Sequence, residues 1–226
     1  MKDSYKSMQK QGGFTLIEIA IVLVIIGLLV GGVLQGQELI ENSRVKQAVK
    51  DLNGTAAAMF AYQDRYGTIP GDDGNTAAIA TRGVSWGSAN LGGDADGILE
   101  STTAQTFTGA GENDNFWRQL MAAGFLSGDP ADQNLLALPN NPWGGRLGVT
   151  TALMGGGLAG TKVCMSQVPG SAAIAIDNQI DDGSGATGRV RATVGVSGAN
   201  TPPTNTALGG GGNYSEDNIY SLCYRM

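Results

Sequence analysis

Glu18 is the residue whose chemistry stands out first, because it is the only ionisable side chain in the apolar run from Phe14 to Leu34. Every position from 19 to 34 is apolar or Gly. A carboxylate within such a run costs about 2.5–3.5 kcal/mol at the middle of a membrane helix. We therefore treat Glu18 as a functional residue that needs a cationic partner.

Few other residues offer catalytic chemistry. The sequence contains no His, which removes the usual general base and most transition-metal ligands. No Ser or Cys lies in a recognisable nucleophile motif, and the glycine run at 155–157 lacks the Lys-Ser/Thr of a phosphate-binding loop. We predict that the protein is not an enzyme.

One acidic segment resembles a metal-binding loop. Asp94, Asp96 and Glu100 alternate with Gly, Ala and Leu, and their oxygens are of the kind that Ca²⁺ prefers. The spacing of an EF-hand is incomplete, however, which favours a solvated acidic turn. We expect no cofactor, and Ca²⁺ bound by these three residues is the alternative.

The apolar run itself predicts one membrane span. As a helix, residues 14–34 rise about 31 Å, which matches the roughly 30 Å hydrocarbon core of a bilayer. Three lysines, Lys2, Lys6 and Lys10, precede it against one acidic residue, Asp3. By the positive-inside rule this basic leader predicts a cytoplasmic N-terminus and a head on the other side of the membrane.

The helix is expected to continue beyond the membrane. Apolar residues recur with helical spacing at Val45, Ala48, Val49, Leu52, Ala56, Met59 and Phe60. No Pro interrupts residues 14–66, and Gly67 is a suitable stop. The first half of this helix needs lipid or neighbouring helices, whereas the second half needs a domain packed on its one apolar face.

Four glycines in the outer part of the span form two GxxxG spacings: Gly27, Gly31, Gly32 and Gly36. Such glycines let helix backbones approach closely. Two alternatives remain: the ordinary frequency of Gly in membrane helices, and easier local unwinding of the helix.

Residues 67–226 are long enough for one globular head with its own core. Gly-rich and polar residues predict a long loop over 68–111, followed by a short helix capped by Asn113-Asp114-Asn115 and ending near Gly124. Four β-rich runs predict strands: Lys162 to Val168, Ala172 to Asp177, Arg189 to Val196, and Ile219 to Tyr224. The expected fold class is α+β, with the long helix packed on a Gly-rich head that contains a small antiparallel sheet.

The head has two further properties that bear on its environment. The chain has a formal charge of −6 and its leader is basic, so the head is acidic and unsuited to binding nucleic acid. Its two cysteines, Cys164 and Cys223, are most simply one disulfide in an oxidising compartment. Two buried free thiols are the alternative.

The N-terminal residues resemble those of the type IV prepilins and of the pseudopilins of type II secretion. The resemblance consists of a basic leader, Gly13, Phe14, then Thr-Leu-Ile-Glu18 and a long apolar helix. It covers residues 1 to about 66. Many family members have a Pro within or just after the span, whereas the first Pro here is Pro70.

The resemblance implies a processing step and a set of partners. A prepilin peptidase would remove the leader, residues 1–13, by cutting between Gly13 and Phe14, and would methylate the new amine of Phe14. Other pilin or pseudopilin subunits and an inner-membrane assembly platform would be the further partners. The protein would lie in the bacterial inner membrane with its head in the periplasm, and then in a filament.

Three functions follow in order of preference. The first is a structural subunit of a type IV pilus-like filament, in which Glu18 pairs with the Phe14 amine of an adjoining subunit. The second is a type II secretion pseudopilin, which shares every motif. The third is a stand-alone membrane-anchored binding protein, which leaves Glu18 unexplained. Pairing of Phe14 and Glu18 within one chain is also open, since they are four residues apart.

Overall fold

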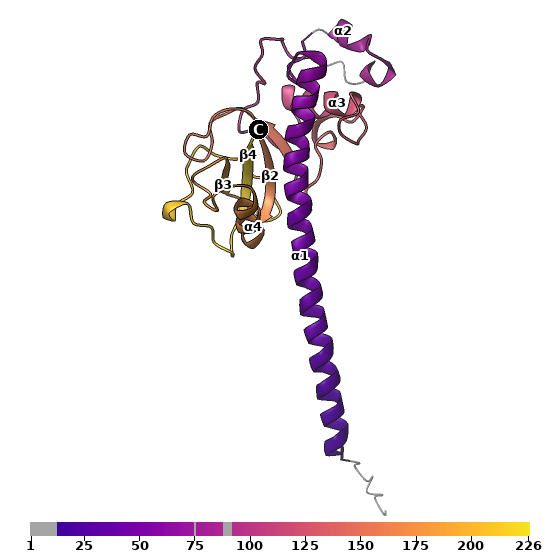
Figure 1. The fold of residues 1–226 in the computed structure, drawn as a ribbon, viewed down its shortest axis with the longest axis vertical. Helices are drawn as coiled ribbons and strands as arrows, with labels where there is room; N and C mark the ends of the chain where they lie inside the picture. The colour runs from indigo at the N-terminus through magenta and orange to yellow at the C-terminus, as the bar shows by residue number, and fades with distance from the viewer. Residues whose placement is uncertain (1–12, 75, 88–91) are drawn as a thin grey trace, which may run out of the picture. The chain divides into compact units, whose positions relative to one another are not determined.

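One long helix, α1 (Leu16–Tyr66), organises the chain (Figure 1). The computed structural model describes residues 13–74, 76–87 and 92–226. It divides the chain into two units, Met1–Asn42 and Ser43–Met226, and α1 runs through both. The helix ends as expected at Gly67, whose φ of 74° is left-handed backbone that Gly adopts without steric cost.

In the first unit, α1 is exposed on all sides. Every residue from 13 to 35 is exposed, and the helix is long and apolar enough, by length and composition, to cross a membrane. An apolar helix surface of this kind is stable in lipid or among other helices rather than in water.

In the second unit, one face of α1 joins the core of the head. The buried residues of this face are Val45, Ala48, Leu52, Thr55, Ala56, Ala58, Met59 and Tyr62. Most of the predicted apolar stripe is therefore confirmed. Phe60 is a correction, because its exposed fraction is 53% whereas Tyr62 is fully buried. The buried stripe advances through 55, 59 and 62, and position 60 lies beside it.

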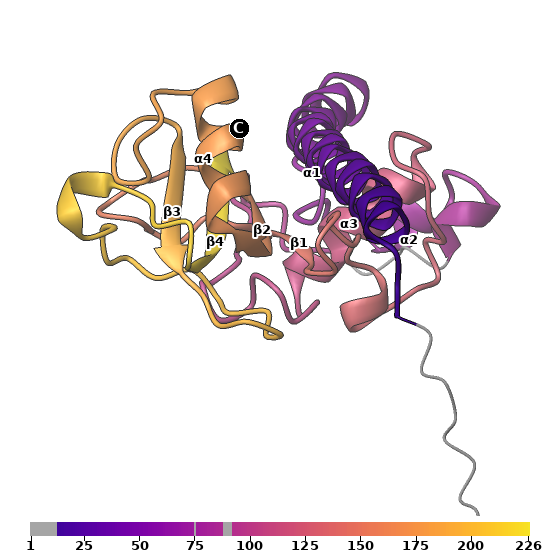
Figure 2. The same ribbon diagram turned by 90° about the horizontal axis from the view of Figure 1, so that it is seen from below.

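The head contains a four-stranded antiparallel sheet in the order β1-β2-β4-β3. The strands are β1 (Leu147–Thr150), β2 (Lys162–Pro169), β3 (Val190–Val194) and β4 (Ile219–Arg225). Helix α4 (Gly170–Ile180) contacts β2, β3 and β4, and α3 (Glu112–Ala122) contacts β1 (Figure 2). The predicted α+β fold with a small antiparallel sheet is confirmed.

Two clusters of buried side chains lie on opposite faces of β2. Val163 and Met165 belong to the large core that includes α1, α3 and α4. Cys164 points the other way, as alternation along a strand requires, into a small cluster with Phe107, Met154, Leu158 and Cys223. Cys164 and Cys223 are directly opposite in the β2–β4 register and form the predicted disulfide.

The run Ala172 to Asp177 was predicted to be a strand, and this prediction is wrong, because the residues lie in α4. Its buried positions, which include Ala172, Ala173, Ile176 and Asp177, follow the helical period rather than alternation. Ala has a high helix propensity, and Pro169 precedes the first helical turn, where its fixed φ is tolerated.

Three other elements depart from expectation. Strand β1 was not predicted, and α2 (Thr76–Ala80) and η1 (Val84–Gly87) lie within the segment expected to be loop. Helix α3 begins at Glu112 after Gly111, without a side-chain cap, rather than after the expected Asn113-Asp114-Asn115. Two further short turns are η2 (Asn134–Leu136) and η3 (Gly210–Gly212).

Candidate functional site

The first turn of α1 holds Glu18 in a reciprocal pair of hydrogen bonds with Thr15. The Thr15 N–H and hydroxyl each donate to Glu18 Oε2 at 2.8 Å, and the Glu18 N–H donates to Thr15 Oγ1 at 3.3 Å. This arrangement is a capping box, in which a Thr before the helix and a Glu three residues later satisfy each other's backbone donors. Thr-Leu-Ile-Glu is therefore also a helix-start signal.

Sequence analysis missed this role of Glu18, although the Thr-x-x-Glu spacing was available to find it. The carboxylate is exposed and bound by neutral donors, and the described chain places no cation within ion-pair distance of it. The capping box orients the carboxylate at the N-terminal end of α1. Its charge is left for a cation that comes from elsewhere.

The expected cleavage point lies directly before this capping box. Gly13 and Phe14 are exposed and precede the first helical residue, and the exposed fraction of Phe14 is 85%. A peptidase requires a non-helical, accessible bond, and this bond meets both conditions. The rest of the expected leader, residues 1–12, lies outside the described residues.

The four glycines of the span face open space. A Cβ at Gly27, Gly31, Gly32 or Gly36 would meet no atom within 4 Å. They are therefore not required by any contact within the described chain. Close packing against another helix stays a prediction.

A family comparison bears on this N-terminal region. A family model described as the prokaryotic N-terminal methylation motif matches residues 8–34. The chain carries the prepilin-type cleavage and methylation signature. No curated protein matches the chain. This prepilin motif is the signature of type IV pilins and pseudopilins, and it indicates a structural subunit rather than an enzyme.

The prepilin motif also gives the exposed span a context. It extends over the capping box and the apolar part of α1 up to Leu34. An apolar helix next to the N-terminus is consistent with membrane anchoring. The motif implies processing by a prepilin peptidase and assembly with other pilin subunits.

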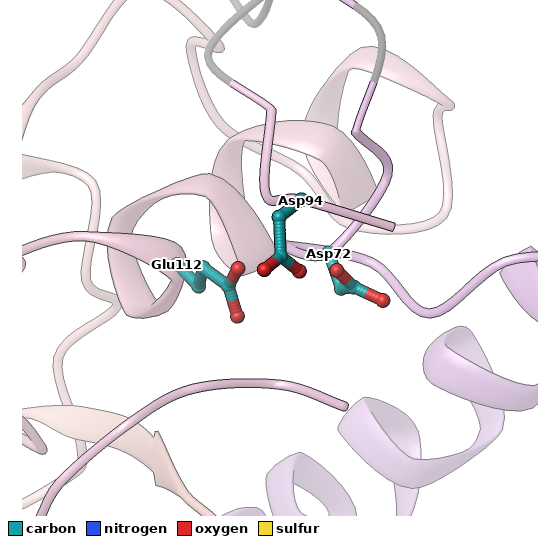
Figure 3. Close-up of side chains that lie close together, drawn as sticks. All are labelled: Asp72, Asp94 and Glu112. Carbon is teal, nitrogen blue, oxygen red and sulfur yellow. The ribbon is translucent and has the colours of Figure 1, made fainter. Parts of the chain in front are cut away.

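A second group of charged residues lies in the head, where Asp72, Asp94 and Glu112 converge (Figure 3). Carboxylate oxygens of the three lie within 4.8 Å of one another. Of the residues singled out in the sequence, only Asp94 belongs to this acidic triad. Asp96 instead accepts the N–H of Ile98 at 2.8 Å, and Glu100 meets the triad through its backbone N–H, which donates to Glu112.

The acidic triad is largely satisfied by the chain itself. The Asp72 carboxylate accepts the N–H groups of Ala95 and Gly97, both at 2.8 Å. Burial raises the pKa of Glu112, and the neighbouring carboxylates, Asp72 first, act in the same direction against the Glu100 N–H bond. Three carboxylates of this kind could ligate a hard cation such as Ca²⁺, but their hydrogen bonds also explain them as a loop clasp.

The segment that carries Asp72 is fixed to the end of α1 by its neighbour. Tyr62 donates its hydroxyl to Asp73 at 2.8 Å, and Asp73 forms an ion pair with Arg82. The Arg82 guanidinium lies over the rings of Tyr66 and Trp86, at 4.6 and 5.1 Å from their centroids. Burial and the Asp73 hydrogen bond raise the pKa of Tyr62, so this hydroxyl remains a donor at all physiological pH values.

Proposed function

We propose that the protein is a structural subunit of a type IV pilus-like filament, assembled through α1 after cleavage between Gly13 and Phe14. The prepilin motif at residues 8–34 supports this directly. The observation that carries the proposal is Glu18, a carboxylate without an ion-pair partner in the described chain on a helix that is otherwise apolar and exposed.

Cleavage would supply the missing cation. The new amine of Phe14, methylated by the same peptidase, lies at the positive end of the α1 dipole. When subunits assemble from the inner membrane into a filament, their apolar helices form a core without water. A buried charge without a partner costs about 3–5 kcal/mol there, so Glu18 pairs with the Phe14 amine of an adjoining subunit. The pair selects one axial register among helices whose apolar surfaces slide freely.

The capping box provides a competing explanation, in which Glu18 only begins the helix. Glu18→Gln separates the two, because Gln also completes a capping box but carries no charge. Thr15→Val is the complementary variant, since it removes the hydroxyl of the cap and leaves the carboxylate. Loss of a cap costs about 0.5–2 kcal/mol of helix stability.

The test is filament incorporation in cells that lack the wild-type copy. Glu18→Gln and Glu18→Ala are expected to be inserted, cleaved and folded normally but to be strongly depleted from sheared filaments. Thr15→Val is expected to assemble with at most a modest loss. Wild-type filament yield from Glu18→Gln would show that the charge does not set the register.

A pseudopilin of type II secretion shares the prepilin motif, the long helix and the proposed role of Glu18. Filament composition separates the two systems: we expect this subunit in surface pili by mass spectrometry. Its recovery only with secretion components would identify the pseudopilin. Heads that stay monomeric after cleavage would instead support a membrane-anchored binding protein.

A further inference from the structure

A cleft of about 480 Å³ in the second unit lies beside α1. One wall is a polar stripe of α1, and the remaining lining comes from α3, β1 and the segments around residues 127 and 140. The lining residues used below are Gln47, Lys50, Asp51, Gly54 and Trp117.

Asp51 gives this cleft an unmet need for a cation. Its carboxylate accepts the Gln47 side-chain amide at 2.6 Å, and the described residues include no ion pair to it within 4 Å. Burial raises the pKa of Asp51, opposed by the Gln47 hydrogen bond and by the charge of Lys50. A half-buried carboxylate with one neutral partner is better satisfied by an additional charged donor.

Two other features indicate that the cleft is built to be filled. A Cβ at Gly54 would meet no atom within 4 Å, so another chain can approach the α1 backbone closely there. Trp117 is fully buried, and its Nε1 has no hydrogen-bond partner among the described residues. Buried donors without a partner are uncommon in folded proteins.

We infer that this cleft receives a second copy of the chain, whose Lys46 pairs with Asp51. The inference rests on the proposed filament, because it requires parallel copies side by side. Lys46 is exposed on α1, five residues before Asp51. Within one helix these two positions do not face each other, since neighbours on a helix surface are three or four residues apart.

Charge and spacing both select a second copy as the occupant. Parallel α1 helices displaced by five residues, about 7.5 Å, bring Lys46 of one copy level with Asp51 of the other. Phe14 and Glu18 are four residues apart and require a displacement of about 6 Å in the same direction. One stagger between copies therefore serves both pairs. The pair in the cleft fixes the contact between heads.

Paired single-cysteine variants test the contact in assembled filaments. Lys46→Cys and Asp51→Cys are expressed together, filaments are sheared under mild oxidation, and dimers are counted on non-reducing gels. We expect a disulfide-linked dimer from the mixture and little from either variant alone. Cys164 and Cys223 do not interfere, because they are already bonded to each other.

Asn53→Cys is the matched control, because Asn53 is exposed on α1 but does not line the cleft. Mixed with Lys46→Cys, it is expected to give at least several-fold less dimer. Charge reversal adds a second readout: Lys46→Glu and Asp51→Lys should each lower filament yield, and their combination in one chain should restore it.

The outcomes distinguish this inference from the proposed function. Normal filaments without the mixed dimer, or with equal dimer from Asn53→Cys, overturn the contact and leave the filament subunit intact. Failure of the wild-type chain to enter any filament overturns the proposed function and the contact together.

Discussion

Lys162, at the start of β2, is a fully buried lysine whose ammonium donates to the Gly160 carbonyl. Burial, and then the positive charge of Arg225, lower its pKa to about 8. The folded state therefore favours the neutral amine, whereas the unfolded chain keeps its proton until about pH 10.5. Stability from this group is expected to rise as the pH increases from about 8 towards 10.5.

Lys162→Met should remove this rise and stabilise the head at pH 7 by about 1–3 kcal/mol. Thermal unfolding at pH 7, 8.5 and 10 measures both effects. Lys50→Met, at an exposed position, is the control and should change neither. A wild-type midpoint that is flat or falls over this pH range while the control behaves as stated would contradict the prediction.

Glu112 has the opposite sign of pH dependence. Its pKa is raised in the folded head, so the stability associated with it is greatest at acid pH and falls as the pH rises above about 4.5. Glu112→Gln keeps an acceptor for the Glu100 N–H and removes the charge. We expect a higher melting midpoint at pH 7 and little difference near pH 4.

The same variant tests the expected absence of a metal. Since we predict no cofactor, millimolar Ca²⁺ should leave the wild-type midpoint unchanged relative to EDTA. A rise with Ca²⁺ that Glu112→Gln abolishes would instead assign the acidic triad as a calcium site.

Among the elements, β1 depends on a glycine. A Cβ at Gly148 would collide with the backbone carbonyl of Thr106, which passes directly over the strand. Gly148→Ala is expected to destabilise the head by about 1–3 kcal/mol, as measured by chemical denaturation. Gly87→Ala, where a Cβ meets nothing within 4 Å, should be close to neutral, and equal effects of the two would refute the argument.

The disulfide joins two strands that are already paired. Cys164 and Cys223 are 59 residues apart in sequence, so the bond constrains a long loop of the unfolded chain. Cys164→Ser should lower the free energy of unfolding by about 4 kcal/mol in the chain-entropy model. Reduction of the wild type should produce a similar loss, and an unchanged denaturation midpoint after verified reduction would contradict it.

The long elements could be predicted from sequence, because their signals are strong and local. The period of α1, its stop at Gly67 and three of the four strands follow from residue patterns alone. Residues 172–177 deceived us because short Ala/Ile runs fit either period. Strand β1 was missed because Gly148, required by a carbonyl 42 residues earlier, weakens the local strand pattern.

The candidate sites divide in the same way. Glu18 and the cleavage motif are readable because their residues are close in sequence, and the capping box could have been read with them. The acidic triad combines Asp72, Asp94 and Glu112, which only the folded head brings together. No local spacing announces such a group.

For the whole molecule, the decisive prediction is processing. The intact mass of membrane-extracted protein should correspond to a chain that begins at a methylated Phe14. Gly13→Val should block the cut by crowding the bond, and the uncut chain should remain in the membrane and be absent from filaments. An N-terminus at Met1 in wild-type cells with an active peptidase would disprove this.

Strand order also has a consequence for the timing of folding. Strand β4 follows all other strands in sequence, yet it lies between β2 and β3 and is the only strand partner of β3. A head exported N-terminus first can therefore pair β1 with β2 early, whereas β3 has no partner until residues 219–225 arrive. Until then, Cys164 has no thiol to oxidise with. Oxidation is thus a late checkpoint of export, and it marks only those heads whose final strand has been delivered.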